Sequence, residues 1–331
     1  MKLLVIGLGS MGKRRIRLLK EHFNEIAVYG ADPLEERREQ AQAQFGIPAY
    51  ADYRVAVEHQ KPEAALVCTA PASHGRIILD CLRAGLAVFS EMNLLWDDYE
   101  EIIKTARDKG LNLFLSSTQL YRKEIEQIKD GVQSQQGRVN YRYHVGQYLP
   151  DWHPWESYKD FFVSEKRTDG CRELFAAELP WMLQTFGEVA EIHVVKDKLS
   201  SLELDFPDNY YVLFTHRNGN KGVLIIDIIS RLPESALLIY SENMHLLWNG
   251  TPGSLFRYNI GEKRLEPVET YQKAEIEQDS RYSEKVIENA YAEELRVFIG
   301  QLRGKQSQVR YTFEKDIHTL HLIDRIEGIG E

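Results

Sequence analysis

The residues best suited to chemistry stand near the start of the chain, where residues 7–12 read GLGSMG. An apolar run at residues 3–6 precedes this loop and a helix-like stretch follows it, which is the context that a G-x-G-x-x-G loop needs to bind a dinucleotide. Gly7 permits a tight turn, Gly9 lets the backbone approach a pyrophosphate, and Gly12 lets helix and strand pack closely. The helix N-terminus then offers free N–H groups to the phosphates. The alternative is a glycine turn that holds no ligand.

Asp32 follows a second predicted strand, at residues 25–29, and stands 20 positions after the last glycine of the loop. At this place a carboxylate accepts hydrogen bonds from the adenosine ribose and repels a 2′-phosphate. NAD is therefore the expected cofactor and NADP the less favoured one, although Arg37 and Arg38 nearby keep NADP open. The alternative interpretation makes Asp32 a turn residue before Pro33.

The segments around the glycine loop and Asp32 alternate between predicted helices and strands. The helix after the glycine loop is expected to be apolar at Ile16, Leu18 and Leu19, with its basic residues mostly outside: Lys13, Arg14, Arg15 and Arg17. Further strands are predicted at residues 64–68, 87–90 and 112–116, and helices at 33–45, 53–59, 75–84 and 97–109. This alternation predicts an α/β Rossmann domain over residues 1–120, with a parallel, doubly wound sheet whose ligand lies at the carboxyl ends of the strands.

Composition excludes several classes of protein. The 331 residues are 43% hydrophobic and 27% charged, which is ordinary for a globular chain of about two domains. A net charge of −9 argues against a nucleic-acid partner. No apolar stretch is long enough to span a membrane, and the N-terminus does not resemble a signal peptide. Three cysteines without metal spacing are typical of reduced thiols, so a cytoplasmic protein is expected.

Three stretches together resemble one protein family: VIGLGSMG at residues 5–12, TAPASHGRIILDCLRAGLAVFSEMN at 69–93, and the helix and strand up to Ser117. They are similar to the Gfo/Idh/MocA oxidoreductases, which are NAD(P)-dependent dehydrogenases and reductases of sugars, inositol and related compounds. The resemblance implies that Thr69, Pro71 and His74 line the cofactor and that Glu91 reaches the nicotinamide ribose. The expected cofactor-binding residues are thus Gly7, Gly9, Ser10, Met11, Gly12, Asp32, Thr69, Pro71, His74 and Glu91.

The chain departs from this family at the residues that usually move a proton. The family's Glu-Lys-Pro motif reads Glu91-Met92-Asn93, and methionine cannot position a substrate or transfer a proton as the lysine does. A second motif, Asp-x-x-(x)-His, is expected near the Phe186-Gly187 segment. Aligning on that segment puts Leu174 in place of the aspartate and Ala177 in place of the histidine. The usual acid/base groups are therefore absent.

Residues 121–331 are expected to form an α+β domain for substrate binding and oligomerisation. Strands are predicted at residues 137–148, 191–198, 210–216, 222–231, 236–241 and 245–248, and helices at 282–302 and 313–326. Consecutive strands without intervening helices predict an open, mainly antiparallel sheet. One face of such a sheet is often buried against a second subunit, so a homodimer or homotetramer formed through this sheet is expected.

Residues 147–158 concentrate aromatic side chains in a segment that two prolines keep out of helix and central strand. Aromatic faces stack on sugar rings, while a polar end reaches the hydroxyls. The alternatives are a loop whose aromatics fill the core, or an oligomer contact. Arg172 could hold a phosphate or carboxylate of the substrate through its planar guanidinium. The expected substrate-binding residues are therefore Met92, Tyr148, Trp152, Trp155 and Arg172. An ordinary helix-start cap is the alternative for Arg172.

Candidates for the missing proton donor are, in order of preference, His153, Glu178, Tyr148 and His144. No metal site is expected, because His318 and His321 have no carboxylate or cysteine arranged around them. Two functions stay open. One is an NAD(P)-dependent oxidoreductase that acts on a sugar or sugar-derived substrate, nucleotide-linked and acidic sugars included. The other is a non-catalytic sensor or regulatory protein that binds dinucleotide and sugar.

Overall fold

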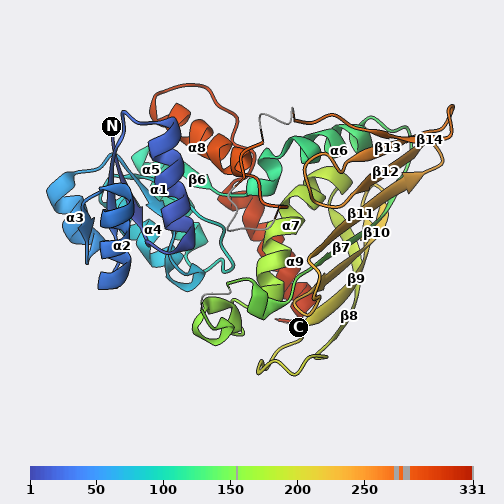
Figure 1. The fold of residues 1–331 in the computed structure, drawn as a ribbon, viewed down its shortest axis with the longest axis horizontal. Helices are drawn as coiled ribbons and strands as arrows, with labels where there is room; N and C mark the ends of the chain where they lie inside the picture. Colours follow the sequence, from blue (N-terminus) through green and yellow to red (C-terminus); the bar gives the residue numbers. More distant parts are fainter. Residues whose placement is uncertain (154–155, 272–275, 279–283, 330–331) are drawn as a thin grey trace. The chain divides into compact units, whose positions relative to one another are not determined.

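The computed structural model describes residues 1–153, 156–271, 276–278 and 284–329 (Figure 1). It divides into two compact units, one of residues 1–118 and 290–320 and the other of residues 119–289 and 321–331. The ranges expected from the sequence are contiguous, whereas the first unit takes in most of helix α8 (Glu288–Leu302). The reason is apolar packing, because the ring of Phe298 meets those of Phe89 and Phe114 at centroid distances of 5.6 and 5.9 Å.

The first unit contains a parallel sheet of six strands in the order β3-β2-β1-β4-β5-β6. Its strands are β1 (Lys2–Ile6), β2 (Ala27–Ala31), β3 (Ala49–Tyr50), β4 (Ala64–Val67), β5 (Ala87–Ser90) and β6 (Leu113–Leu115). The connecting helices are α1 (Ser10–His22), α2 (Glu35–Phe45), α3 (Tyr53–Gln60), α4 (His74–Arg83) and α5 (Tyr99–Lys109). β4 and β5 are buried along their whole length, as expected when helices cover both faces of a sheet. The predicted doubly wound Rossmann fold is confirmed.

Helix α1 differs from its sequence-based description. Arg14 is 5% exposed and Arg15 is fully buried, although both were expected mostly outside. The hydrophobic pattern did not predict this burial, because it treats arginine as a surface residue. It also contains no information on carboxylates that distant elements place beside the arginine. Arg15 is buried because it is paired, as described below.

The second unit is built on a sheet of eight strands in the order β14-β13-β12-β11-β7-β10-β9-β8. The strands are β7 (Asn140–Gly146), β8 (Val189–Asp197), β9 (Asn209–His216), β10 (Lys221–Asp227), β11 (Glu234–Ser241), β12 (Met244–Trp248), β13 (Phe256–Asn259) and β14 (Arg264–Pro267). Only β7 and β10 pair in parallel; the other neighbours are antiparallel, so the predicted mainly antiparallel sheet is confirmed. The sequence analysis missed β13 and β14, which are short and mostly half-buried or exposed and therefore lack a clear alternation.

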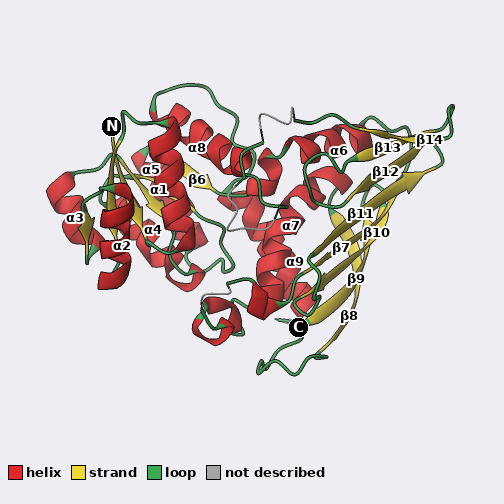
Figure 2. Cartoon of the chain, viewed as in Figure 1, coloured by secondary structure: helices red, strands yellow, loops and turns green. Residues whose placement is uncertain are grey.

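Helices α6 (Lys123–Gln133) and α7 (Gly170–Phe186) cover one face of this sheet (Figure 2). Tyr141 stacks on Phe186 at 4.0 Å between ring centroids, and Tyr143 meets Trp181 edge-on at 5.5 Å. Alternate residues of β7 therefore form the core of the unit, while Arg142 and His144 lie on the opposite face. The chain ends with helix α9 (Phe313–Glu327).

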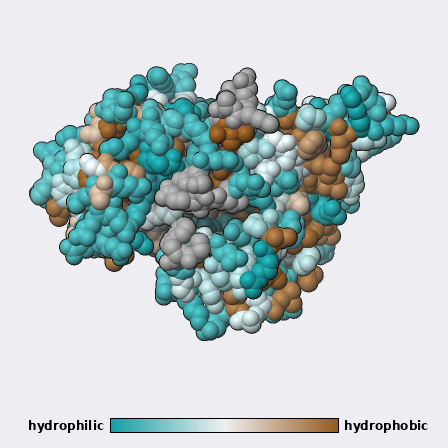
Figure 3. All heavy atoms as spheres, in the orientation of Figure 1, coloured by the Kyte–Doolittle hydropathy of each residue, from teal (hydrophilic) through white to brown (hydrophobic). Residues whose placement is uncertain are grey.

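The opposite face of the sheet carries apolar side chains that keep much of their surface exposed. Strand register places Val195, Tyr211, Leu213, Val223, Ile225, Leu238, Tyr240 and Leu247 on this face, which we call the open face. Val195 is 70% exposed and Tyr211 50%. Figure 3 shows hydrophobic residues gathered along the side of the second unit where β8 to β12 lie. Within the described residues, no helix is long and apolar enough to cross a membrane.

Candidate functional site

The glycine loop has the backbone geometry that its sequence predicts. Gly7 has a φ of +91°, which side chains rarely tolerate, and a Cβ there would lie 2.6 Å from the carbonyl oxygen of Cys68. A Cβ on Gly12 would lie 1.9 Å from the carbonyl oxygen of Gly7, so only glycine allows helix α1 to approach β1 this closely. Around Gly9 the nearest atoms are 3.7 Å or more away and belong to the end of the Arg37 side chain. The middle of the loop is thus open to a ligand.

The N-terminus of α1 fits a pyrophosphate. Gly9 is the N-cap residue and supplies no side chain to bond the first N–H groups, and the first turn contains no acidic residue. Ser10 and Met11, the other expected contacts in the loop, are half-buried. The sulfur of Met11 accepts a hydrogen bond from Nη1 of Arg14 at 3.2 Å. The first N–H groups of a helix point outward at its N-terminus, and together with the positive end of the helix dipole they favour an anion at this place.

Asp32 is 3% exposed at the end of β2. Its Oδ2 accepts a hydrogen bond from the backbone N–H of Leu8 at 2.8 Å, and its Oδ1 accepts one from the N–H of Leu34 at 2.9 Å. A carboxylate can accept about four hydrogen bonds, so acceptor positions for two ribose hydroxyls remain. Nη1 of Arg37 lies 3.7 Å from Oδ2, which places a cation beside the same position. The residues present therefore fit an NAD cofactor.

The loops after β4 and β5 are joined by a buried chain of polar groups. Nε2 of His74 lies 2.8 Å from the carbonyl oxygen of Thr69, and Nδ1 lies 2.6 Å from Oδ1 of Asn93. Asn93 donates to the hydroxyl of Tyr99 at 2.7 Å, and that hydroxyl donates to Asp316 at 2.5 Å. Burial lowers the pKa of His74, opposed by its bonds to Asn93 and Thr69. His74 thus fixes the shape of the loop that also contains Pro71, which is buried at the start of a short helical turn.

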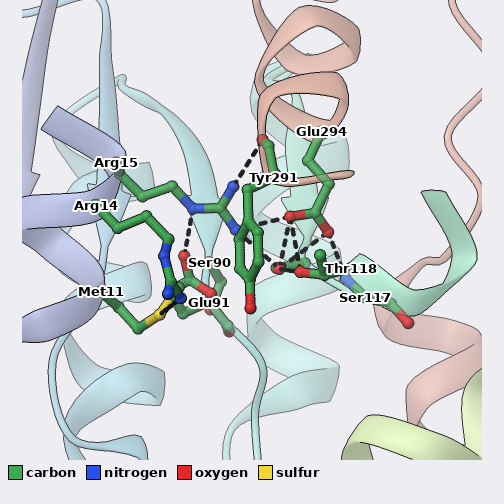
Figure 4. Close-up of polar contacts among 10 residues, drawn as sticks. Met11, Arg14, Arg15, Ser90, Glu91, Ser117, Thr118, Tyr291 and Glu294 are labelled. Carbon is green, nitrogen blue, oxygen red and sulfur yellow. Dashed lines mark hydrogen bonds and ion pairs between the residues drawn. The ribbon is translucent and has the colours of Figure 1, made fainter. Parts of the chain in front are cut away.

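Glu91 belongs to a buried ion-pair cluster around Arg15 (Figure 4). Nε of Arg15 lies 2.5 Å from Oε1 of Glu91, and Nη2 lies 2.7 Å from Oε2 of Glu294 on helix α8. The same guanidinium donates to Ser116 Oγ at 3.1 Å and to the backbone oxygen of Tyr291 at 3.0 Å. Arg15 therefore connects the start of α1 with the carboxyl ends of β5 and β6.

In this cluster two carboxylates, of Glu91 and Glu294, share the guanidinium of Arg15. Burial works to lower the pKa of Arg15, but Glu91 and Glu294 outweigh it and raise that pKa above its usual value. Burial raises the pKa of Glu294, opposed by Arg15 and by hydrogen bonds from Ser116. Glu91 keeps 9% of its surface exposed, whereas Glu294 has none. Of the two, Glu91 is the one that a cofactor can reach. Met92, the next residue, is half-buried.

In the second unit, the aromatic segment after β7 is partly packed and partly exposed. Trp152 is half-buried, donates from Nε1 to the carbonyl oxygen of Gln147 at 3.1 Å, and lies against the start of helix α7. The ring of Tyr148 is covered by the guanidinium of Arg231 at 3.5 Å from its centroid. His153 pairs with Glu156 at 2.7 Å between Nδ1 and Oε1. Trp155 lies outside the described residues.

Two of the proposed proton donors, Glu178 and His144, have partners within the protein. Glu178 is 4% exposed, and its carboxylate accepts from Tyr143, Trp181 and Gln119 at 2.9, 2.6 and 3.1 Å. Nε2 of His144, on the open face, lies 2.6 Å from Oδ2 of Asp227. Both geometries favour a structural role.

Arg172 is 2% exposed on α7. Its Nη2 bonds Asp324 at 2.7 Å and its Nη1 bonds Glu327, so both arms of the guanidinium fork are used within the protein. Burial raises the pKa of Glu327 to about 8, opposed by Arg172. We therefore do not carry the expectation of a substrate anion at Arg172 into the proposed function.

Residues 1–117 match the family model GFO_IDH_MocA, described as an oxidoreductase family with an NAD-binding Rossmann fold. These residues therefore form an NAD-binding Rossmann domain of the Gfo/Idh/MocA oxidoreductase family. A myo-inositol 2-dehydrogenase from Thermotoga maritima is 26% identical to this chain over 137 residues. That match spans 40% of this chain and 41% of the relative.

Solved structures are similar to this protein in fold over the whole chain. An oxidoreductase from Agrobacterium radiobacter, in complex with NAD⁺, L-tartaric acid and magnesium, has a TM-score of 0.81 at 14% identity, covering 100% of this chain and 97% of that one. The WlbA dehydrogenase from Bordetella pertussis, in complex with NADH and UDP-GlcNAcA, has a TM-score of 0.76 at 15% identity, covering 100% and 97%. At such identities the likeness shows the fold of both units.

The sequence analysis did not single out three residues of the polar clusters described above: Arg15, Glu294 and Asn93. Arg15 and Glu294 are 279 positions apart, and no local pattern connects them. Asn93, which stands where the family has proline, was seen only as a departure, although its side chain joins His74 to Tyr99. The sequence did contain a signal for Asn93, namely an apolar strand that ends in Ser-Glu-x-Asn. Polar residues directly after a buried parallel strand lie at the edge of the sheet where ligands bind.

Proposed function

We propose that this protein is an NAD-dependent oxidoreductase that transfers a hydride to or from a sugar or a sugar-derived substrate. The observation that carries the proposal is the glycine loop, whose open centre at Gly9 lies beside the buried carboxylate of Asp32. Glu91 follows β5, which is separated from β1 by β4 in the same sheet, and the residue is 9% exposed. These features support dinucleotide binding at the carboxyl edge of the sheet.

The bound nicotinamide would supply the hydride acceptor or donor, while the protein binds, orients and exchanges one proton. Gly7, Gly9, Ser10, Met11 and Gly12 would hold the pyrophosphate, and Asp32 the adenosine ribose. Thr69, Pro71, His74 and Glu91 would shape the nicotinamide end. Arg15 would orient Glu91 without touching the cofactor, since Arg15 is fully buried.

The substrate class rests on two supports. Trp152 and Tyr148 offer aromatic faces in the segment after β7, a chemistry that suits the apolar side of a sugar ring. Solved structures with this fold include dehydrogenases with a nucleotide-linked acidic sugar and an oxidoreductase with L-tartaric acid. We therefore include nucleotide-linked and acidic sugars, and we keep Met92 and Trp155 as proposed substrate contacts.

A second function, that of a sensor binding dinucleotide and sugar without turnover, is favoured by one observation. The positions at which the family has its lysine, aspartate and histidine hold Met92, Leu174 and Ala177 in this chain. Replacement of all three residues at once is expected in a protein that still binds its ligands but no longer catalyses proton transfer. The same titration separates the two functions, because a sensor binds NADH and never oxidises it.

We also propose that the open face is buried in a homodimer or homotetramer. Its apolar side chains span five strands, from β8 to β12, and an exposed apolar patch of this extent usually marks a contact with another protein. A second copy of the chain is the simplest occupant, because a two-fold contact pairs the patch with itself.

The test is a fluorescence titration of the purified protein with NADH and NADPH, repeated in the presence of nucleotide sugars and sugar acids. Tight NADH binding and weaker NADPH binding, followed by oxidation of NADH or reduction of NAD⁺ with one of these substrates, would support the oxidoreductase. Binding without turnover would favour the sensor. The absence of any cofactor binding would overturn both functions.

A further inference from the structure

Glu173 is a glutamate whose surroundings differ from those of Glu178 on the same helix. Glu178 is fully partnered, as described above. Oε2 of Glu173 is buried and has no hydrogen-bond partner among the described residues. Nearly all buried polar side-chain atoms in proteins have a partner, so an unpartnered carboxyl oxygen calls for a ligand, a strain or a catalytic explanation.

The position of Glu173 on α7 relates it to the aromatic segment. Gly170, Glu173, Leu174 and Ala177 follow the i, i+3, i+4, i+7 spacing that puts side chains on one helix face. Glu173, Leu174 and Ala177 are half-buried, while their neighbours on the other faces are buried. At the start of this face, a Cβ on Gly170 would lie 3.5 Å from the ring of Trp152 and 3.3 Å from Leu149.

This face is also where the family's proton-handling pair is missing. Ala177 and Leu174, which replace the histidine and the aspartate, are half-buried and apolar. Glu173 is one turn before Ala177 and is the only ionisable side chain among the half-buried residues on this face of the described helix. The face therefore retains one group able to exchange a proton.

The electrostatics of Glu173 suit that role. Burial raises the pKa of Glu173 from its usual value of 4.5 to about 7, and no neighbouring charge opposes the shift. A carboxyl group with a pKa near the working pH is populated in both its protonated and its ionised form, which is the condition for efficient general acid/base catalysis. The residue as a whole keeps some exposed surface, while its Oε2 atom is buried.

We propose that Glu173 is the general base for the substrate hydroxyl in oxidation and the general acid in the reverse direction. In oxidation the O–H bond breaks and its proton goes to the Glu173 carboxylate, while the C–H bond breaks and its electron pair leaves with the hydrogen as hydride to NAD⁺. The alcohol becomes a carbonyl, NAD⁺ becomes NADH, and Glu173 then releases the proton to solvent. This assignment rests on the oxidoreductase function proposed above.

The decisive variant is Glu173→Gln, which keeps the size of the side chain and removes the titrating proton. We expect NADH binding within twofold of wild type and turnover lowered by about 10²–10⁴-fold. The pH profile of kcat/KM should lose its limb near pH 7. Glu173→Asp should restore part of the turnover. The control is Glu165→Gln, an exposed glutamate of the same unit, which should leave turnover and pH profile unchanged.

A readout that needs no turnover is the infrared spectrum of the protein across the pH range. The difference between the wild-type and Glu173→Gln spectra should contain a protonated carboxyl band that titrates near pH 7, distinct from that of Glu327, whose pKa burial raises to about 8. The difference between the wild-type and Glu165→Gln spectra should lack this band. Unchanged turnover and pH profile in Glu173→Gln, with wild type active, would overturn the role of Glu173 and leave the oxidoreductase standing. A wild-type protein that binds no NADH, or binds it without turning over any sugar, would overturn the oxidoreductase first and the role of Glu173 with it.

Discussion

Nε of Arg15 lies 2.5 Å from Oε1 of Glu91, and both residues are buried at the edge where the glycine loop meets the end of β5. The two residues are 76 positions apart. Glu91 is the residue that the family resemblance assigns to the nicotinamide ribose. A buried cation therefore holds in place the carboxylate that we propose to contact the cofactor, so the stability of the fold is coupled to the geometry of the proposed site.

Replacing Arg15 with methionine should be strongly destabilising. The change keeps the apolar stem but leaves Glu91 and Glu294 buried without their counter-charge, and breaking a buried pair in this way costs about 3–5 kcal/mol. Urea unfolding followed by circular dichroism measures the loss. The matched control is Arg83→Met, which breaks the exposed pair with Glu101 and should cost about 0–1 kcal/mol. Equal losses in the two variants would contradict the role of Arg15.

Arg37 should control how well the protein accepts NADP. Its guanidinium lies beside both Asp32 and the open centre of the glycine loop, where a 2′-phosphate would otherwise meet only a carboxylate. In Arg37→Ala we expect NADPH binding to weaken by about tenfold or more, since a hydrogen bond to a charged group contributes about 1.5–3 kcal/mol. NADH binding should change little. Equal weakening of both cofactors in the fluorescence titration would show that Arg37 does not select between them.

Asn93→Ala should destabilise the first unit by about 1–3 kcal/mol. The substitution removes the amide that joins His74 to Tyr99. The buried Nδ1 of His74 then loses its bond to Asn93, whereas the Tyr99 hydroxyl keeps its bond to Asp316. Thermal unfolding should show the loss, and Asn24→Ala, at an exposed asparagine of the same unit, should not. A midpoint unchanged in Asn93→Ala would mean that the network contributes nothing to stability.

Leu213→Glu should dissociate the proposed oligomer. Leu213 is 45% exposed on β9, beside Val223 of β10 on the open face, and a carboxylate there would have to be desolvated in a contact formed through this face. Analytical ultracentrifugation should report an oligomer for wild type and a monomer for the variant. Leu34→Glu, at an exposed leucine of the first unit, is the control and should remain oligomeric. A monomeric wild type would refute the proposed contact directly.

The ionisation of Glu173 should make the protein less stable as the pH rises. Because the folded-state pKa of about 7 lies above the usual 4.5, the folded protein binds the proton more tightly than the unfolded chain. Its stability therefore falls between pH 4.5 and 7, by at most about 3 kcal/mol. Glu173→Gln should melt at a higher temperature than wild type at pH 8 and show no such advantage at pH 4.5. Glu165→Gln should follow wild type at both pH values.

The strand and helix order was predictable where the signal was local. The run into Gly7, the alternation of β7 and the apolar runs of β4 and β5 each depend on residues close together in the chain. The boundaries of α2 to α5 matched to within two residues for the same reason, whereas α8 begins at Glu288, after its predicted start at residue 282, and α6 was not predicted. The burial of Arg15 was not predictable, because no local pattern distinguishes it from Arg17 on the same helix.

The candidate site shows the same division. Its cofactor side follows from motif spacing, because glycine geometry and a helix N-terminus act over a few residues. The substrate side does not follow from the sequence. Glu178 as a proton donor and Arg172 as an anion-binding residue were chosen without knowledge of their partners in the fold. Glu178 is saturated by Tyr143, Trp181 and Gln119, and Arg172 by Asp324 and Glu327, whereas Glu173 keeps an unpartnered oxygen.

The Rossmann fold, the antiparallel sheet and the dinucleotide loop follow from local sequence, because these features depend on short-range periodicity and on glycines that tolerate no side chain. Which charged residues are buried and which are paired depends on contacts between distant elements. The partners of Arg15 and Arg172 come from elements up to 279 positions away, and a side chain's ionisation depends on those partners and on its access to water.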